Sequence, residues 1–220
     1  MSLSFRNFTL TPLKALLLTA LCIALAGCGN ESATIRYRAT AKFIVDGELR
    51  EGSAVRETTF TETPNSLIGF VMNIDDRGEA AAVDVGSGHG VYFLRNDRSG
   101  SGSVLPETMR QCFGIEIGKS GSGWTREFDN IPVDGTCSLS QSEMEISKPL
   151  IVAFLRENVP ASIFEATPEA LKGAFNIDVR FDGFSFERVP DNTPLTKAID
   201  QRLPWLNDIP FEGSNIRVLQ

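Results

Sequence analysis

The feature that most constrains the fold is an alternation of apolar and polar side chains over residues 34–45. Five apolar residues share one phase of it: Ile35, Tyr37, Ala39, Ala41 and Phe43. Successive side chains of a strand point to opposite faces, so this period of two is typical of a half-buried strand. Asp46-Gly47-Glu48 is a turn signal, and residues 53–62 have the composition of a partner strand. We therefore predict a long β-hairpin.

The rest of the chain continues this pattern in short segments. Further strands are predicted at residues 67–74, 79–85, 91–94, 149–155 and 177–189. A loose glycine loop over residues 86–90 separates two of them, and Gly183 is a candidate β-bulge. Short helices are predicted to start at Thr167-Pro168 and Thr193-Pro194, each with a capping residue before a proline. The predicted class is α+β, mostly β, with antiparallel sheets and two short helices in the C-terminal third.

Residues 97–148 are irregular and rich in glycine, with one alternating segment at residues 113–117. We interpret this stretch as a long excursion from a single domain that spans residues 35–220. Cys112 and Cys137 lie within it, and an exported chain meets oxidising conditions, so the two thiols are expected to pair. Two separate buried thiols are the alternative. A zinc site is disfavoured because one distant histidine does not complete four ligands.

Residues 1–27 have the organisation of a lipoprotein signal peptide. Arg6 and Lys14 precede an apolar run over residues 15–26, which is too short to span a membrane. The segment Leu25-Ala26-Gly27-Cys28 resembles the bacterial lipobox. That resemblance implies a diacylglycerol on Cys28, cleavage before it, and a tether over residues 28–34. An ordinary secretory leader is the alternative.

The location and the partners follow from this anchor and from charge. No Asp follows Cys28 directly, which favours the outer membrane, with the domain in the periplasm. Removal of the leader leaves 19 basic and 28 acidic residues, a net charge of −9. Such a charge argues against nucleic acid and against broad contact with anionic lipid. The acyl chains are therefore the expected membrane attachment.

Several segments together resemble an uncharacterised proteobacterial protein family. Tyr37-Arg38-Ala39-Thr40 and Ser53-Ala54-Val55-Arg56-Glu57 match its front hairpin, and LTKAIDQRLPWL at residues 195–206 matches its closing signature. The RLPWL part is the most specific. Ala198 stands where the family has glycine, and residues 97–148 have no match. The resemblance implies a small, mostly β domain behind an export signal, and it implies no activity.

Catalytic and metal-binding readings are weak. His89 is the only histidine, and it lies in the predicted glycine loop. No nucleophile elbow is present, and residues 118–123 fail the spacing of a phosphate-binding loop. Six carboxylates are candidates for a paired-acid site: Asp75, Asp76, Asp129, Asp134, Glu143 and Glu145. A glycosidase needs two carboxylates that face each other across a cleft, and spacing along the sequence does not show such a pair. We predict no cofactor and no metal.

The two tryptophans have different expected roles. Trp205 is read as a lid on the core, and Trp124, in the glycine-rich excursion, is a candidate contact residue. The first functional hypothesis is a non-enzymatic, lipid-anchored envelope protein that binds or supports a partner protein. The alternatives are a hydrolase of an envelope polymer with paired carboxylates, and a carrier of a small ligand or lipid. A roomy apolar cavity would favour the carrier.

Overall fold

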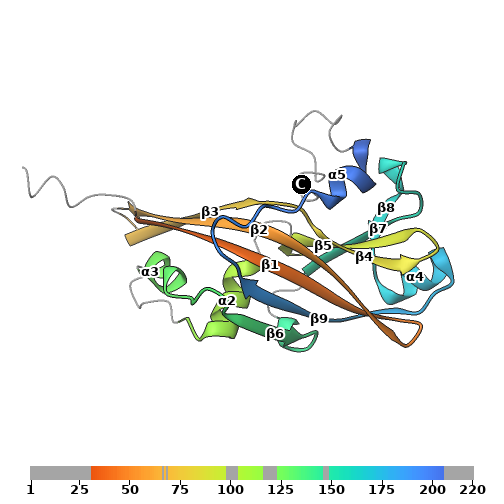
Figure 1. Cartoon of the computed structure of the whole chain (residues 1–220), viewed down its shortest axis with the longest axis horizontal. Helices are drawn as coiled ribbons and strands as arrows, with labels where there is room; N and C mark the ends of the chain where they lie inside the picture. Colours follow the sequence, from red (N-terminus) through yellow and green to blue (C-terminus); the bar gives the residue numbers. More distant parts are fainter. Residues whose placement is uncertain are drawn as a thin grey trace, which may run out of the picture.

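The computed structural model describes residues 31–65, 67, 69–97, 104–115, 123–145 and 149–205. Two antiparallel sheets form the domain, with strand orders β3-β2-β1-β9-β6 and β4-β5-β7-β8 (Figure 1). The first sheet contains β1 (Glu31–Val45), β2 (Glu48–Asn65), β3 (Gly69–Arg77), β6 (Thr136–Ser140) and β9 (Val179–Arg188). The second contains β4 (Ala81–Gly86), β5 (His89–Asp97), β7 (Pro149–Phe154) and β8 (Ile163–Glu165).

The helices are α2 (Leu105–Phe113), α3 (Trp124–Asp129), α4 (Pro168–Phe175) and α5 (Ala198–Arg202), with 3-10 turns η1 (Glu143–Glu145) and η2 (Pro160–Ser162). The predicted α+β, mostly β class is confirmed. Within the part of the chain that the structure describes, no helix combines the length and the apolar character needed to cross a bilayer.

The predicted front hairpin is present and is longer than expected. Asp46 and Gly47 form its two-residue turn with positive φ values of 48° and 87°, the conformation that Asp-Gly favours. All five apolar residues of the alternating segment are buried. The tether was predicted to reach residue 34, and this is wrong at its end. Residues 31–34 are already strand, because they pair with Thr59–Glu62 of β2.

The main core lies between the two sheets, which approach closely along one side. There a Cβ on Gly52 of β2 would lie 1.9 Å from the carbonyl oxygen of Ala82 in β4. The longer sheet extends past the shorter one. Its inner face at the free end, towards the β2–β3 turn, is covered by α3, where Phe128 stacks on Phe60 with 4.0 Å between ring centroids.

The described parts of the excursion predicted over residues 97–148, namely residues 104–115 and 123–145, pack into the domain core and its longer sheet. Met109 of α2 and Phe128 of α3 are fully buried in the main core, and β6 pairs with β9 as the edge of the longer sheet. The predicted strand at residues 113–117 is wrong, since Phe113 ends α2 and residues 116 and 117 lie outside the described part. The pairing partner of β6 lies more than 40 residues away, so no local pattern indicates it. The predicted disulfide between Cys112 and Cys137 is confirmed, and it joins α2 to β6.

The predicted bulge in β9 is confirmed, and it explains the phase of that strand. Lys42 pairs with Gly183 and Phe43 with Phe181, so Asp182 is the extra residue. The bulge shifts the alternation of side chains along β9 by one residue. Phe181 and Phe184 therefore both face the inner side of the longer sheet. Gly183 has a φ of 156°, and a Cβ there would lie 2.4 Å from the Leu139 carbonyl oxygen. Glycine is therefore required at this position.

Two further predictions need correction. The loop predicted over residues 86–90 is a tight turn at Ser87-Gly88, and His89 begins β5. The helix predicted from Thr193 begins only at Ala198, because the preceding segment runs across the outer face of the longer sheet. On that face Arg36 donates a hydrogen bond to the Thr193 carbonyl, and Thr196 bonds the free edge of β2 at Val55. Figure 1 shows this segment passing from β9 to α5.

Candidate functional site

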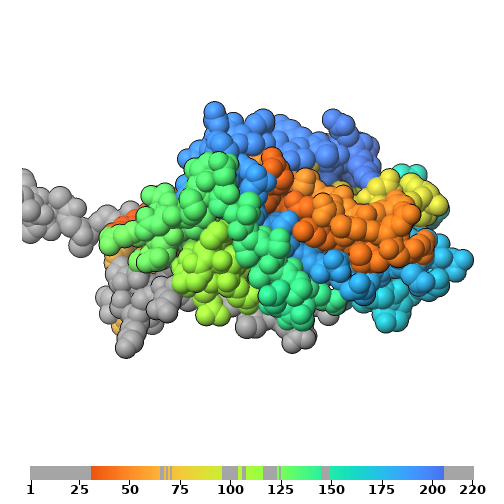
Figure 2. Space-filling view, turned by 60° about the horizontal axis from the view of Figure 1, so that its bottom comes forward, coloured from red at the N-terminus to blue at the C-terminus, as the bar shows by residue number. Residues whose placement is uncertain are grey.

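One feature of chemical interest is a pocket at the open side of the sandwich. The sheets are pressed together at β2 and β4, and on the other side β6 and β8 are the sheet edges. A pocket of about 590 Å³ lies there, between β6 and η1 on one side and β7, β8 and α4 on the other. Its volume is within the range of small-molecule sites. In Figure 2 the segment from β6 (green) and the β1–β2 hairpin (orange) frame this part of the surface.

The floor of the pocket is apolar and belongs to the core. Phe43, Met144, Leu171 and Val179 line it, and all four are buried. Each comes from a different element, respectively β1, η1, α4 and β9. The Phe43 ring also meets the partly buried Phe181 edge to face, with 5.3 Å between centroids. This floor is held by the fold itself, so it exists without a ligand.

The rim of the pocket is polar. Ser140, Gln141, Ser142, Glu165, Arg180 and Asp182 line it. The Arg180 guanidinium lies 3.5 Å from the Asp182 carboxylate, and its side chain stays mostly exposed. Thr167 also lines the pocket, but its hydroxyl accepts the Ala170 N–H as the N-cap of α4. An apolar floor with a charged and hydroxyl-bearing rim suits an amphipathic small molecule, with its apolar body inside and its polar group at the mouth.

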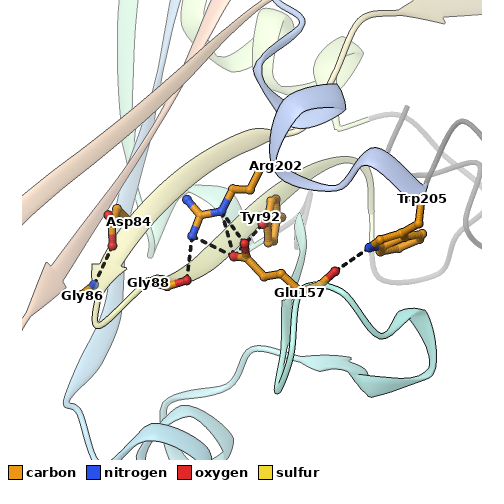
Figure 3. Close-up of polar contacts among 7 residues, drawn as sticks. All are labelled: Asp84, Gly86, Gly88, Tyr92, Glu157, Arg202 and Trp205. Carbon is orange, nitrogen blue, oxygen red and sulfur yellow. Dashed lines mark hydrogen bonds and ion pairs between the residues drawn. The ribbon is translucent and has the colours of Figure 1, made fainter.

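A second cluster lies on the outer face of the shorter sheet, beneath α5 (Figure 3). Arg202 donates from Nε to both carboxylate oxygens of Glu157, at 2.8 and 2.9 Å, and its Nη2 lies 2.7 Å from Oε1. The Tyr92 hydroxyl donates to the same carboxylate at 2.8 Å. The indole N–H of Trp205 donates to the Glu157 backbone carbonyl. Side chains from β5, from α5 and from the segment after α5 therefore converge on one residue in the β7–η2 connection.

This cluster has a structural role, because it fixes α5 against the shorter sheet. Burial, together with the hydrogen bond to Glu157, raises the pKa of the Tyr92 phenol, so Tyr92 stays a neutral donor. Trp205 packs edge-on against Phe154, at 5.6 Å between centroids, in an apolar cluster with Ile199 and Leu203. The reading of Trp205 as a lid over apolar residues is consistent with these contacts. Within the described residues the cluster joins α5 to the sheet, and its polar groups satisfy one another.

Buried charge also joins the two sheets, where the sequence suggested no site. Arg56 of β2 is 2% exposed. Its guanidinium donates to the backbone carbonyls of Glu79 and Phe93, at 2.7 and 2.8 Å. Desolvation lowers the pKa of Arg56 and raises that of the neighbouring Tyr37. These groups bond to protein atoms, so we assign them to fold stability.

The structure separates the residues that the sequence singled out. Cys28 lies outside the described residues, as do residues 118–122 of the phosphate-loop-like segment. Trp124 is the first residue of α3, and the described atoms do not include its side chain. His89 stacks on Phe175 of α4, at 4.0 Å between centroids. Ser140 at the pocket rim bonds Glu143, so no serine–histidine pair is found at the pocket among the described residues.

The candidate carboxylates do not form a catalytic pair in the described part of the chain. Asp76 accepts a hydrogen bond from Thr58 between the sheets, and Asp75 pairs with Arg77 on an exposed edge. Glu143 accepts two bonds from Ser140, which lower its pKa. Residues 31–65, 69–97, 104–115, 123–145 and 149–205 contain no group of three or more potential metal ligands.

Sequence reasoning missed the pocket and Glu157. The pocket is formed where five non-adjacent segments meet, and none of them carries a motif. Glu157 stands between apparent turn residues and has no local signal, although its partners Arg202 and Trp205 lie in the RLPWL segment. Comparisons with family models, with curated proteins and with solved structures give no match for this chain.

Proposed function

We propose that this protein is a lipid-anchored, non-enzymatic binding module of the bacterial cell envelope. In this proposal Cys28 carries the acyl chains, the outer membrane holds them, and the domain stands in the periplasm. The support is the lipobox-like Leu25-Ala26-Gly27-Cys28 and the lack of Asp directly after Cys28. A partner protein in the envelope would deliver or receive what the module binds.

The observation that carries the binding function is the pocket of about 590 Å³ with its preformed apolar floor. Of the alternatives that the sequence left open, such a pocket favours a small-ligand carrier over a hydrolase. The ligand class is amphipathic, with an apolar body for the Phe43–Leu171 floor and a polar or anionic group for Arg180 at the rim. Met109 of α2 and Phe128 of α3 are buried in the core, and residues 140–142 line the pocket. We therefore assign the binding surface to this pocket and not to an exposed excursion.

The test is to fill the pocket. Ala166 lines it, and a phenylalanine side chain there would occupy its volume. We expect Ala166→Phe to weaken binding of 8-anilinonaphthalene-1-sulfonate, an aromatic anion used as the probe, by at least about fivefold. The measurement is a fluorescence titration of the purified mature protein. Organic extraction of protein purified from membranes, followed by mass spectrometry, would then identify the natural ligand.

Ala161→Phe is the matched control, because Ala161 is exposed in η2 and does not line the pocket. It adds the same ring to the surface and should leave the titration unchanged. Thermal unfolding of both variants checks that each is folded. Equal probe binding by wild type, Ala166→Phe and Ala161→Phe would remove the basis for a ligand site here.

A further inference from the structure

The end of the molecule that carries the amino terminus also carries a protruding leucine. Asn65 and Gly69 form the last pair of the β2–β3 hairpin, and Leu67 lies in the turn beyond it. The Leu67 side chain is 92% exposed, the largest value among the exposed large apolar residues of the described chain. In water this side chain gains no hydrophobic stabilisation, whereas contact with an apolar surface would provide it.

The length of the chain before β1 identifies that surface. Cys28 precedes Glu31, the first residue of β1, by three positions. Three residues span at most about 10 Å. Glu31 pairs with Glu62, and β2 continues from there for three residues to Asn65, about 10 Å farther in the same direction. Figure 1 shows the start of β1 and the turn end of the β2–β3 hairpin at the same end of the molecule. The chain between Cys28 and Glu31 is therefore long enough for the acyl chains of Cys28 to lie level with the Leu67 turn.

The charges at this end select the kind of lipid contact. Glu31 and Arg126 form an exposed pair at 4.0 Å, and Glu127 and Asp129 are exposed on the same short helix. This end therefore has no described cluster of cations for anionic headgroups, in keeping with the acidic body of the protein. The contact that remains is apolar. It fits the interfacial region of a neutral, zwitterionic bilayer, where an apolar side chain can enter beside acyl chains.

We propose that Leu67 is a second membrane contact, which inserts into the interface of the bilayer that holds the acyl chains of Cys28. Two contacts at one end fix the orientation of the domain, whereas a single point of attachment leaves it free to turn. The long axis of β1 then points away from the membrane. Phe43 at the pocket floor lies 12 residues after Glu31, which places the pocket about 40 Å from that end. This inference rests on the lipid anchor of the proposed function.

The test uses the full, lipidated chain in phosphatidylcholine vesicles. With Cys28 acylated and Cys112 bonded to Cys137, a cysteine introduced into the mature chain is its only free thiol. Leu67→Cys is labelled with a polarity-sensitive fluorophore. Leu49→Cys is the matched control, because Leu49 is also an exposed leucine of the hairpins, 55% exposed, at the opposite end of β2. We expect the label at residue 67 to shift to shorter wavelength and to be quenched by acyl-brominated lipid. The label at residue 49 should show neither effect.

Vesicle flotation separates failure of the contact from failure of the anchor. If the wild type floats, Cys28→Ala does not, and both labels report water, the anchor stands and the Leu67 contact is refuted. If the wild type does not float either, the lipid anchor itself fails and the contact proposed on it falls as well. Flotation of the wild type with a shifted and quenched label at residue 67 alone supports both. High salt should not reverse this shift, because the contact is apolar.

Discussion

At the scale of single residues, two glycines of this chain meet opposite surroundings. Gly52 faces the other sheet, where a Cβ would lie 1.9 Å from a backbone oxygen and 2.9 Å from the Val83 side chain. Gly173 lies on the exposed side of α4, where a Cβ would meet nothing within 4 Å. The same added methyl group therefore has opposite consequences at the two positions.

We predict that Gly52→Ala lowers the free energy of unfolding by about 3 kcal/mol or more, because the backbones of β2 and β4 must move apart. Gly173→Ala should raise it by about 0.5–1 kcal/mol, because alanine loses less backbone entropy in a helix. Urea denaturation of the two variants and the wild type measures both changes. A mild effect at residue 52 would mean that the sheets are farther apart than described.

At the scale of an element, α5 depends on a residue outside itself. The backbone N–H groups of its first turn have no acceptor within the helix. The N-cap residue, Lys197, makes no side-chain hydrogen bond to them. Glu79, which is 6% exposed and lies between β3 and β4, accepts from Ile199 N and Asp200 N at 3.0 and 3.3 Å. The backbone carbonyl of Glu79 also accepts a hydrogen bond from the Arg56 guanidinium. The short helix is thus capped by a carboxylate from a distant loop.

Burial raises the pKa of Glu79, although the hydrogen bonds from α5 act in the opposite direction. A carboxyl group whose pKa is higher in the folded state binds more protons there, so its contribution to stability falls as pH rises. We therefore compare the free energy of unfolding of the wild type with that of Glu79→Gln. The wild-type value should fall relative to the variant value as pH rises through and above about 4.3, the ordinary pKa of Glu. Urea denaturation of both proteins from pH 4 to pH 7 measures this difference. A difference that stays constant with pH, or that changes in the opposite direction, would contradict the raised pKa of Glu79.

At the scale of the whole molecule, the sandwich is closed on one side and open on the other. On the closed side β2 and β4 meet at Gly52 and Ala82. On the open side β6 is an edge strand of only five residues, and the Cys112–Cys137 disulfide ties it to α2. This covalent tie holds β6, whose last residue, Ser140, lines the pocket.

We predict that Cys112→Ala with Cys137→Ala destabilises the domain by up to about 3.5 kcal/mol, the chain-entropy value for a loop with the observed separation of 25 residues. Chemical reduction of the wild type should reproduce the loss, and reduction of the double variant should add nothing. Denaturation curves with and without reductant provide the measurement. Equal stability of all forms would mean that the tie contributes only to the rate of folding.

The sequence by itself determined the elements whose signal is local. The alternation from Ile35 to Phe43, the Asp46-Gly47 turn, the Thr167 cap before Pro168 and the Gly183 bulge each depend on neighbouring residues, and the structure contains all of them. The disulfide prediction depended on the expectation that the chain is exported, which would leave Cys112 and Cys137 to pair. The limits of these elements were less predictable, and pairing with β2 extends β1 to Glu31.

Only the tertiary structure decided which distant segments meet. Residues 97–148 were interpreted as an excursion because their pattern is irregular and rich in glycine. Their described apolar side chains, such as Met109 and Phe128, are instead buried in the main core. Glu79 and Glu157 have structural roles because both bind α5. Glu79 accepts hydrogen bonds from its backbone N–H groups, and Glu157 pairs with Arg202. The pocket lies where the sheets diverge, so its lining comes from five separate segments that no spacing connects. Contacts between residues far apart in the chain depend on the global packing of sheets, and a local pattern does not encode that packing.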